Sequence, residues 1–181
     1  MTAKQKIIMT SDLLYLQYLT PQMVDQSYVD WLNNPTVNQY LEARFGAPYT
    51  LESVRKYVVQ TSKDPSTHFF AIFLKENERY IGNVKIGPIN DHHHYADIGI
   101  MIGDRSSWGK GCATEAIRLA ANFAFKKLKV HKLIAGVYSN NIASIKAFTK
   151  AGFVTEGCLV KKYLSNNKYV DHVLLGKTSQ Q

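Results

Sequence analysis

The sequence is poor in cysteine and proline and has no long apolar run. Of its 181 residues, two are cysteine and five are proline. Two thiols, Cys112 and Cys158, cannot build a disulfide framework, which favours a reducing compartment. No apolar stretch approaches the roughly 18 residues of a membrane span. Residues 1–6 also lack the apolar stretch of a secretory signal, so we expect a cytoplasmic protein.

Acidic residues are also scarce relative to basic ones. There are 14 Asp and Glu against 22 Lys and Arg, a formal net charge of +8. Such a balance favours anionic partners but does not separate a nucleic-acid binder from an enzyme with an anionic cofactor. No recognition-helix or RNA-binding strand motif is present, so nucleic acid is not expected as the main partner. Three consecutive histidines, 92–94, have no second ligand cluster, so we expect no metal site.

The pattern of apolar residues predicts one mixed α/β domain over residues 1–181. A hydrophobic fraction of 45% is that of a globular protein with a full core. Alternating or continuous apolar runs predict strands over 7–18, 68–75, 79–86, 96–102, 133–137, 156–164 and 169–175. Helices are predicted over 20–32, briefly around 37–40, over 51–61, from 112 onward and over 142–150. Gly87-Pro88 is expected to end the strand before it.

The most informative stretch is a strand, a glycine-bearing turn and a helix within residues 95–128. Gly109 and Gly111 precede a helix whose first N–H groups have no intrahelical partner, an arrangement suited to a phosphate. A Walker loop is excluded because Lys110 is followed by glycine, and a dinucleotide fingerprint because Thr114 replaces its third small residue. On glycine spacing alone, an ordinary strand-to-helix turn remains the alternative.

Residues 106–111, Ser-Ser-Trp-Gly-Lys-Gly, resemble motif A of the GCN5-related N-acetyltransferases, Gln/Arg-x-x-Gly-x-Gly/Ala. Ser106 departs from the pattern at its first position. The longer string 108–116 is similar to the branch of ribosomal-protein N-terminal acetyltransferases. The resemblance implies a mostly antiparallel mixed sheet of about seven strands, flanked by helices and splayed at a coenzyme A site. It also implies coenzyme contacts at Ile100, Met101, Ile102, Ser107, Trp108, Gly109, Lys110, Gly111, Cys112 and Ala113.

A second segment, residues 141–153, resembles the family's other coenzyme segment. Asn141 and Ser144 fall on coenzyme-contacting positions, and so does Phe148. Many members have a tyrosine there that protonates the departing thiolate, which a phenylalanine cannot do. A thiol of pKa about 8.5 can leave as thiolate near neutral pH. Tyr138, Tyr163 and water remain open as proton donors.

The implied reaction is direct attack of a primary amine on the thioester of acetyl-CoA. The ammonium, of pKa roughly 10, must first lose its proton to a base. Asp97, the one acid within the apolar run 96–102, is our candidate, acting directly or through water. Burial is expected to raise its pKa. A structural acid with an internal partner is the alternative. In the family a backbone N–H, here near Met101 or Ile102, stabilises the oxyanion.

For the acceptor side we select Trp31, Tyr40, Arg44 and His93. The stretch 31–40 is similar to the same branch, whose first helices wall the acceptor site, and Arg44 is expected to hold a phosphate or carboxylate bidentately. Core aromatics are the alternative for Trp31 and Tyr40. Acceptors to consider are a protein N-terminus, an amino sugar and a small amine, and the positive charge disfavours a polyamine. A catalytically inactive coenzyme A sensor, a basic nucleic-acid-binding module and a homodimer also stay open.

Overall fold

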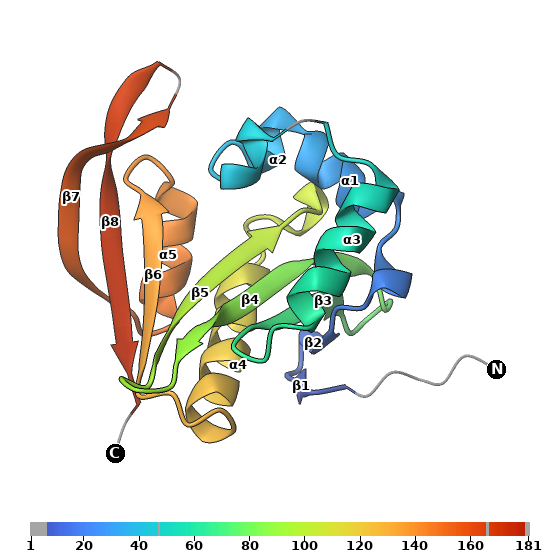
Figure 1. The fold of residues 1–181 in the computed structure, drawn as a ribbon, viewed down its shortest axis with the longest axis horizontal. Helices are drawn as coiled ribbons and strands as arrows, with labels where there is room; N and C mark the ends of the chain where they lie inside the picture. The colour runs from blue at the N-terminus through green and yellow to red at the C-terminus, as the bar shows by residue number, and fades with distance from the viewer. Residues whose placement is uncertain (1–6, 47, 166, 180–181) are drawn as a thin grey trace.

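A computed structural model describes residues 7–46, 48–165 and 167–179. Its centre is one eight-stranded sheet in the order β1-β2-β3-β4-β5-β6-β8-β7 (Figure 1). The strands are β1 Met9–Thr10, β2 Leu14–Tyr18, β3 His68–Leu74, β4 Tyr80–Asn90, β5 Tyr95–Ile102, β6 Lys132–Tyr138, β7 Val154–Ser165 and β8 Lys168–Thr178. All neighbours run antiparallel except β5 and β6. The mostly antiparallel mixed sheet predicted from the sequence is therefore confirmed.

Most strand ends differ from the prediction by one to three residues, and two predictions differ by more. The stretch 7–18 was predicted as one strand but forms the hairpin β1–β2, in which Met9 pairs with Leu16. Its turn is fixed by the Ser11 amide donating to the Leu14 carbonyl at 2.8 Å. Gly87-Pro88 does not end β4, because the strand passes it through a bulge and pairs again at Ile89. Proline is tolerated in a sheet at such bulges.

Helices cover both faces of the sheet (Figure 1). Helices α4 Cys112–Lys126 and α5 Ile142–Lys150 pack into one core with Ala96 and Ile98. Helices α1 Gln26–Asn33 and α3 Leu51–Ser62 form the other core, which Met101 joins. Successive strand residues point to opposite faces, so the even-numbered residues of β5 face α4 and the odd-numbered ones face the side of α1 and α3.

Capping side chains set most of the helix starts. Thr50 forms a capping box with Ser53 at α3, and the Asn141 side chain accepts from the Ser144 amide at α5. The helix predicted over 20–32 is in fact divided. A 3-10 turn, η1 Pro21–Met23, precedes α1, whose cap is Asp25. Short segments α2 Pro35–Asn38, η2 Glu42–Phe45 and η3 Arg105–Ser107 complete the fold. Among the described helices, none is long and apolar enough to cross a membrane.

The parallel pair β5–β6 is joined at three positions only, Tyr95 with Lys132, Ala96 with Leu133 and Asp97 with Ile134. Beyond Asp97, the described part of β5 pairs with β4 alone, and β6 pairs with β8. The two strands therefore diverge toward their carboxyl ends (Figure 1). We call this opening the splay.

Candidate active site

The turn that leads from β5 into α4 is shaped by two glycines in the left-handed region. Gly109 has φ 73° and Gly111 has φ 82°, values that disfavour any other residue. A Cβ built on either glycine meets no atom within 4 Å, so the space in front of the turn is open. Gly111 is the N-cap of α4. The first N–H groups of α4 and the positive end of its dipole thus face open space, which fits a phosphate.

A second helix N-terminus lies at the same opening. Helix α5 begins at Ile142, shortly after the carboxyl end of β6, and α4 follows the carboxyl end of β5 through η3 and the glycine turn. Because β5 and β6 are parallel, the two helix starts flank the open end of the splay. A hollow of about 600 Å³ adjoins the first turn of α4, where Gly111, Thr114 and Arg118 line it. The site therefore has room for more than a single phosphate.

Polar contacts hold the start of the turn rigid. The Asp104 carboxylate accepts hydrogen bonds from the Ser106 amide at 3.0 Å and from the Ser107 hydroxyl at 2.9 Å. Arg79 adds an ion pair with Asp104 at 3.0 Å. Burial opposes ionisation of this carboxyl, but the hydrogen bonds from Ser106 and Ser107 and the charge of Arg79 outweigh it and lower the pKa of Asp104. Ser106, which departs from motif A, is thus part of the scaffold of the turn.

Trp108 has a role that the sequence did not reveal. Its ring is 41% exposed, and its indole Nε1–H donates to the Ile102 carbonyl at 2.7 Å. This bond ties the glycine turn to the last residue of β5. It also occupies one of the backbone groups at the mouth of the splay. Trp108 therefore positions the turn, whatever further contact its exposed ring makes.

The predicted coenzyme residues differ in how exposed they are. Lys110, Gly109 and Gly111 are exposed at the turn, and Ala113, Asn141, Ser144, Ile100, Met101 and Ile102 are partly buried around the splay. Ser107 and Cys112 are buried, so only their backbone groups are available there. Phe148 is 2% exposed and packs edge-to-face on Phe153 at 5.1 Å. Its ring is thus a core side chain, and our expectation that it contacts the coenzyme finds no support in its burial.

Asp97 lies at the closed end of the splay, as the last residue of β5 that pairs with β6. Its neighbours Ala96 and Ile98 are buried in the core under α4, so its carboxylate is on the opposite face. The side chain is exposed, which corrects the expectation of a buried acid. Partial desolvation nevertheless raises the pKa of Asp97, while the charge of Lys85 acts to lower it.

A polar strut crosses the open end of the splay on the side of Asp97. The Tyr138 hydroxyl donates to Glu42 Oε1 at 2.9 Å and accepts from Arg44 at 2.9 Å. Arg44 also donates to the carbonyls of Leu164 at 3.0 Å and Gln39 at 2.7 Å. We call the set Glu42, Arg44 and Tyr138 the strut. It joins η2 to β6 and β7, segments about a hundred residues apart in the chain.

The strut changes two interpretations. The terminal nitrogens of Arg44 already have internal partners, so Arg44 is not presented as the free bidentate clamp that we expected. Tyr138 has its single proton engaged by Glu42, which leaves it unsuited to protonate a thiolate. Burial first, and then the bond to Glu42, raise the pKa of Tyr138. Tyr163 stacks on it with ring centroids 4.1 Å apart.

The remaining acceptor-side candidates do not all meet. Tyr40 lies beside the strut, where its hydroxyl donates to the Asn140 carbonyl at 3.2 Å. Trp31 packs on Tyr80 with centroids 5.0 Å apart and lies against Gly103, just after β5. His93 lies in the turn before β5, at the other end of that strand, which is about 23 Å long at ~3.3 Å per residue. The structure does not bring His93 to Trp31, Tyr40 or Arg44.

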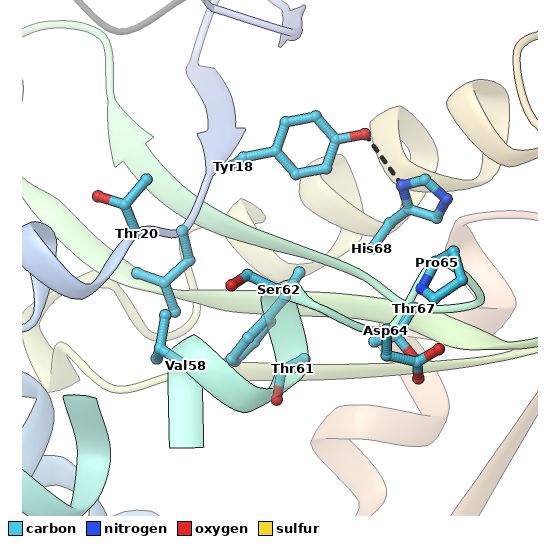
Figure 2. A pocket seen from close by; sticks show the side chains of 11 residues that line it. Tyr18, Thr20, Val58, Thr61, Ser62, Asp64, Pro65, Thr67 and His68 are labelled. Carbon is cyan, nitrogen blue, oxygen red and sulfur yellow. Dashed lines mark hydrogen bonds between the residues drawn. The ribbon is translucent and has the colours of Figure 1, made fainter. Parts of the chain in front are cut away.

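The hollow drawn in Figure 2 is a different place on the molecule. It has a volume of about 330 Å³ and lies between the end of β2, the start of β3 and the end of α3. The Tyr18 hydroxyl and His68 Nδ1 are 2.9 Å apart at its rim. None of our predicted site residues lines it.

A mixed sheet splayed at its one parallel pair, with two helix starts at the opening, defines the class of GNAT acetyltransferases. The chain belongs to this family, because the model of the acetyltransferase (GNAT) domain matches residues 14–154. The probable N-acetyltransferase YjcK of Bacillus subtilis (strain 168) is 36% identical over 148 residues, which cover 79% of this chain and 81% of that protein. The protein is thus an N-acetyltransferase of the GNAT type, as the sequence motifs indicated.

Solved structures share the same fold. The spermidine N-acetyltransferase from Vibrio cholerae, in complex with CoA and spermine, has a TM-score of 0.81 and 25% identity, covering 93% of this chain and 96% of that one. The ribosomal-protein-S5-alanine acetyltransferase from Vibrio fischeri has a TM-score of 0.83 and 21% identity, covering 98% of each chain. These two neighbours have different named acceptors. The fold therefore leaves the acceptor of this chain to be argued from its own residues.

Proposed function

We propose that the protein transfers the acetyl group of acetyl-CoA to a primary amine by direct attack, with residues 1–181 acting as one GNAT domain. The observation that carries this proposal is the splay of β5 from β6 after three residue pairs, with the glycine turn at its mouth. The backbone N–H groups of residues 107–113 would hold the pyrophosphate of the coenzyme. Asn141 and Ser144, at the start of α5, would contact the same ligand.

Asp97 is the proposed base, acting on the amine directly or through a water. It lies at the closed end of the splay, on the face away from α4, where the acetyl end of an inserted thioester would meet an incoming amine. Its raised pKa strengthens it as a proton acceptor. The β6-facing N–H groups of β5 beyond Asp97, near Met101 and Ile102, supply donors for the oxyanion.

The leaving thiolate needs no acid from this chain near neutral pH, because a thiol pKa of about 8.5 permits departure as the anion. Phe148 carries no proton, and the Tyr138 proton is held by Glu42. Water at the mouth of the splay then completes the exchange. Among the side chains at the splay, removal of the Asp97 carboxylate should therefore lower the turnover rate most.

Among acceptors, we favour a protein N-terminus or an amino sugar over a polyamine. Three relatives are named spermidine N(1)-acetyltransferases, and the one from Vibrio cholerae is 34% identical over 91 residues, half of this chain. A polyamine with several ammonium groups needs acidic partners. The acids that flank residues 31–41 are Asp30 and Glu42, which already accept hydrogen bonds from Gln26 and Tyr138. The chain also carries a net charge of +8, which disfavours a polycation.

A screen of thiol release from acetyl-CoA across amine classes tests the proposal. Wild-type protein should release thiol with at least one class, and Asp97→Asn should release it far more slowly while binding acetyl-CoA normally. Binding without release from any amine would instead favour a coenzyme A sensor, the alternative that Phe148 suggests. Failure to bind acetyl-CoA would refute the proposal altogether.

A further inference from the structure

Lys85 lies on the same face of the sheet as Asp97. Its positive charge has no role in the proposed acetyl transfer. Its neighbours Val84 and Ile86 are buried in the core under α4, so its side chain leaves β4 on the opposite face. Lys85 pairs with Gly99 of β5, two residues along from Asp97. Lys85 and Asp97 are therefore diagonal neighbours in the sheet, about 7–8 Å apart at the backbone.

The Lys85 ammonium has spare hydrogen-bonding capacity. It donates to the Tyr57 hydroxyl at 3.3 Å, which occupies one of its three hydrogens. In the part of the chain that the structure describes, no carboxylate lies within ion-pair distance of it. Its charge still reaches Asp97, since it opposes the rise of that carboxyl's pKa. A half-buried cation with two unassigned donors thus stands beside the proposed base.

The surface of the sheet between the Lys85 ammonium and the Asp97 carboxylate is open. Gly99 lies directly across from Lys85, and a Cβ built on it would meet nothing within 4 Å. An amine held at Asp97 would therefore have free space on the side of Lys85. Tyr57, which is 43% exposed, forms the far wall on α3. The Asp97 carboxylate and the Lys85 ammonium are therefore separated by enough space for a small molecule to contact both.

We propose that Lys85 binds a carboxylate or phosphate of the acceptor, so that the acceptor is a small amine with an anionic group near its nitrogen. This inference rests on the proposed acetyl transfer and narrows its acceptor from a protein N-terminus or an amino sugar to an amino sugar or another small amine that carries an anionic group. An amine with a single charge gains nothing from Lys85, and a polyamine is repelled by it. A charge-assisted hydrogen bond contributes about 1.5–3 kcal/mol, or roughly 10- to 100-fold in affinity.

Pairs of acceptors that differ only in the anion provide the test. β-Alanine is compared with β-alaninamide, and glucosamine 6-phosphate with glucosamine, so the two arms distinguish a carboxylate from a phosphate. For wild-type protein, kcat/KM should favour the anionic member of at least one pair by about 10-fold or more. Lys85→Gln should reduce that ratio to near one, and Lys85→Glu should favour a diamine over both members.

The ratio separates the proposed contact from an indirect effect. Removing Lys85 also alters the pKa of Asp97, but that change affects both members of a pair equally and cancels. Lys63→Gln, an exposed lysine at the end of α3, is the matched control and should keep the wild-type ratio. Equal kcat/KM within both pairs for wild-type protein, or a ratio unchanged in Lys85→Gln, would overturn the assignment.

Binding gives a readout that is independent of turnover. In calorimetry on the protein saturated with coenzyme A, the preferred anionic amine should bind wild-type protein about 10-fold or more tightly than it binds Lys85→Gln. If this difference appears without any acetylation, the acetyl-transfer proposal fails and the Lys85 site stands. If the anionic amines neither bind nor react, the Lys85 site is wrong.

Discussion

Replacing Gly111 by alanine should separate the two properties of the turn, its backbone conformation and its open front. Gly111 has φ 82°, and an L-residue in the left-handed region costs about 1–2 kcal/mol. The added methyl group meets no protein atom within 4 Å, so no repacking cost joins that strain. The methyl instead occupies the space in which we place the coenzyme pyrophosphate.

The expected result is a modest loss of stability and a larger loss of affinity. A destabilisation of 1 kcal/mol lowers Tm by about 2–4 °C in a chain of this size, so Gly111→Ala should melt roughly 2–8 °C lower. Its Kd for acetyl-CoA should rise at least tenfold, which corresponds to about 1.4 kcal/mol. Calorimetry and thermal melting on the same samples give both numbers.

Gly152→Ala is the matched control. Gly152 follows the C-terminus of α5 with φ 90°, and its nearest contact is the flexible end of Lys177 at 3.2 Å. It should lose similar stability yet keep wild-type affinity for acetyl-CoA. Wild-type affinity in Gly111→Ala would move the phosphate site away from the turn. Equal losses in both variants would mean that strain, and not the open front, explains the effect.

Three further substitutions address the base, the strut and the scaffold of the turn. Asp97→Asn should slow acetylation by roughly 10²–10⁴, with a smaller deficit at high pH where more amine is already neutral. Because folding raises the pKa of Asp97, its ionised form costs stability above that pKa. The variant should thus melt at a higher temperature than wild type at pH 7, and at the same temperature well below the ordinary pKa of an aspartate. Calorimetric scans across pH would detect this difference. Tyr138→Phe removes the hydroxyl that joins Glu42 to Arg44. In steady-state kinetics this variant should have a higher KM for the acceptor and an unchanged affinity for acetyl-CoA. A change in both constants would contradict the placement of the strut at the acceptor side. Trp108→Phe removes the hydrogen bond from the indole to the Ile102 carbonyl, which contributes about 0.5–1.5 kcal/mol. Calorimetry should show acetyl-CoA binding weakened severalfold. Unchanged binding would show that the turn does not depend on this hydrogen bond.

Local signals in the sequence were sufficient where the structure depends on near neighbours. The helix over 142–150 was predicted as observed, because its capping side chain, which the structure shows to be Asn141, and its 3.6-residue period act within a few residues. The strand, glycine turn and helix over 95–126 were likewise anticipated. By contrast, the β1–β2 hairpin was missed, since its alternation runs through a turn without glycine or proline.

Features that depend on segments far apart in the chain could not be predicted from the sequence. Asp97 is exposed although its strand neighbours Ala96 and Ile98 are buried, and whether another segment covers that face of β5 cannot be read from the periodicity within the strand. The guanidinium of Arg44 was expected to be free but meets Tyr138 and Leu164, 94 and 120 residues along the chain. His93 was placed at the acceptor side by resemblance alone, and the length of β5 separates it from Trp31.

Amide hydrogen exchange with and without acetyl-CoA is the most direct test of where the coenzyme lies. At a ligand concentration about 100 times Kd, binding stabilises the folded site by about 2.7 kcal/mol, which slows exchange through global opening by roughly 100-fold. Protection should be strongest at residues 107–113, with a second protected group at the start of α5 near Ser144. Tight binding that protects other segments while leaving residues 107–113 unchanged would contradict the account.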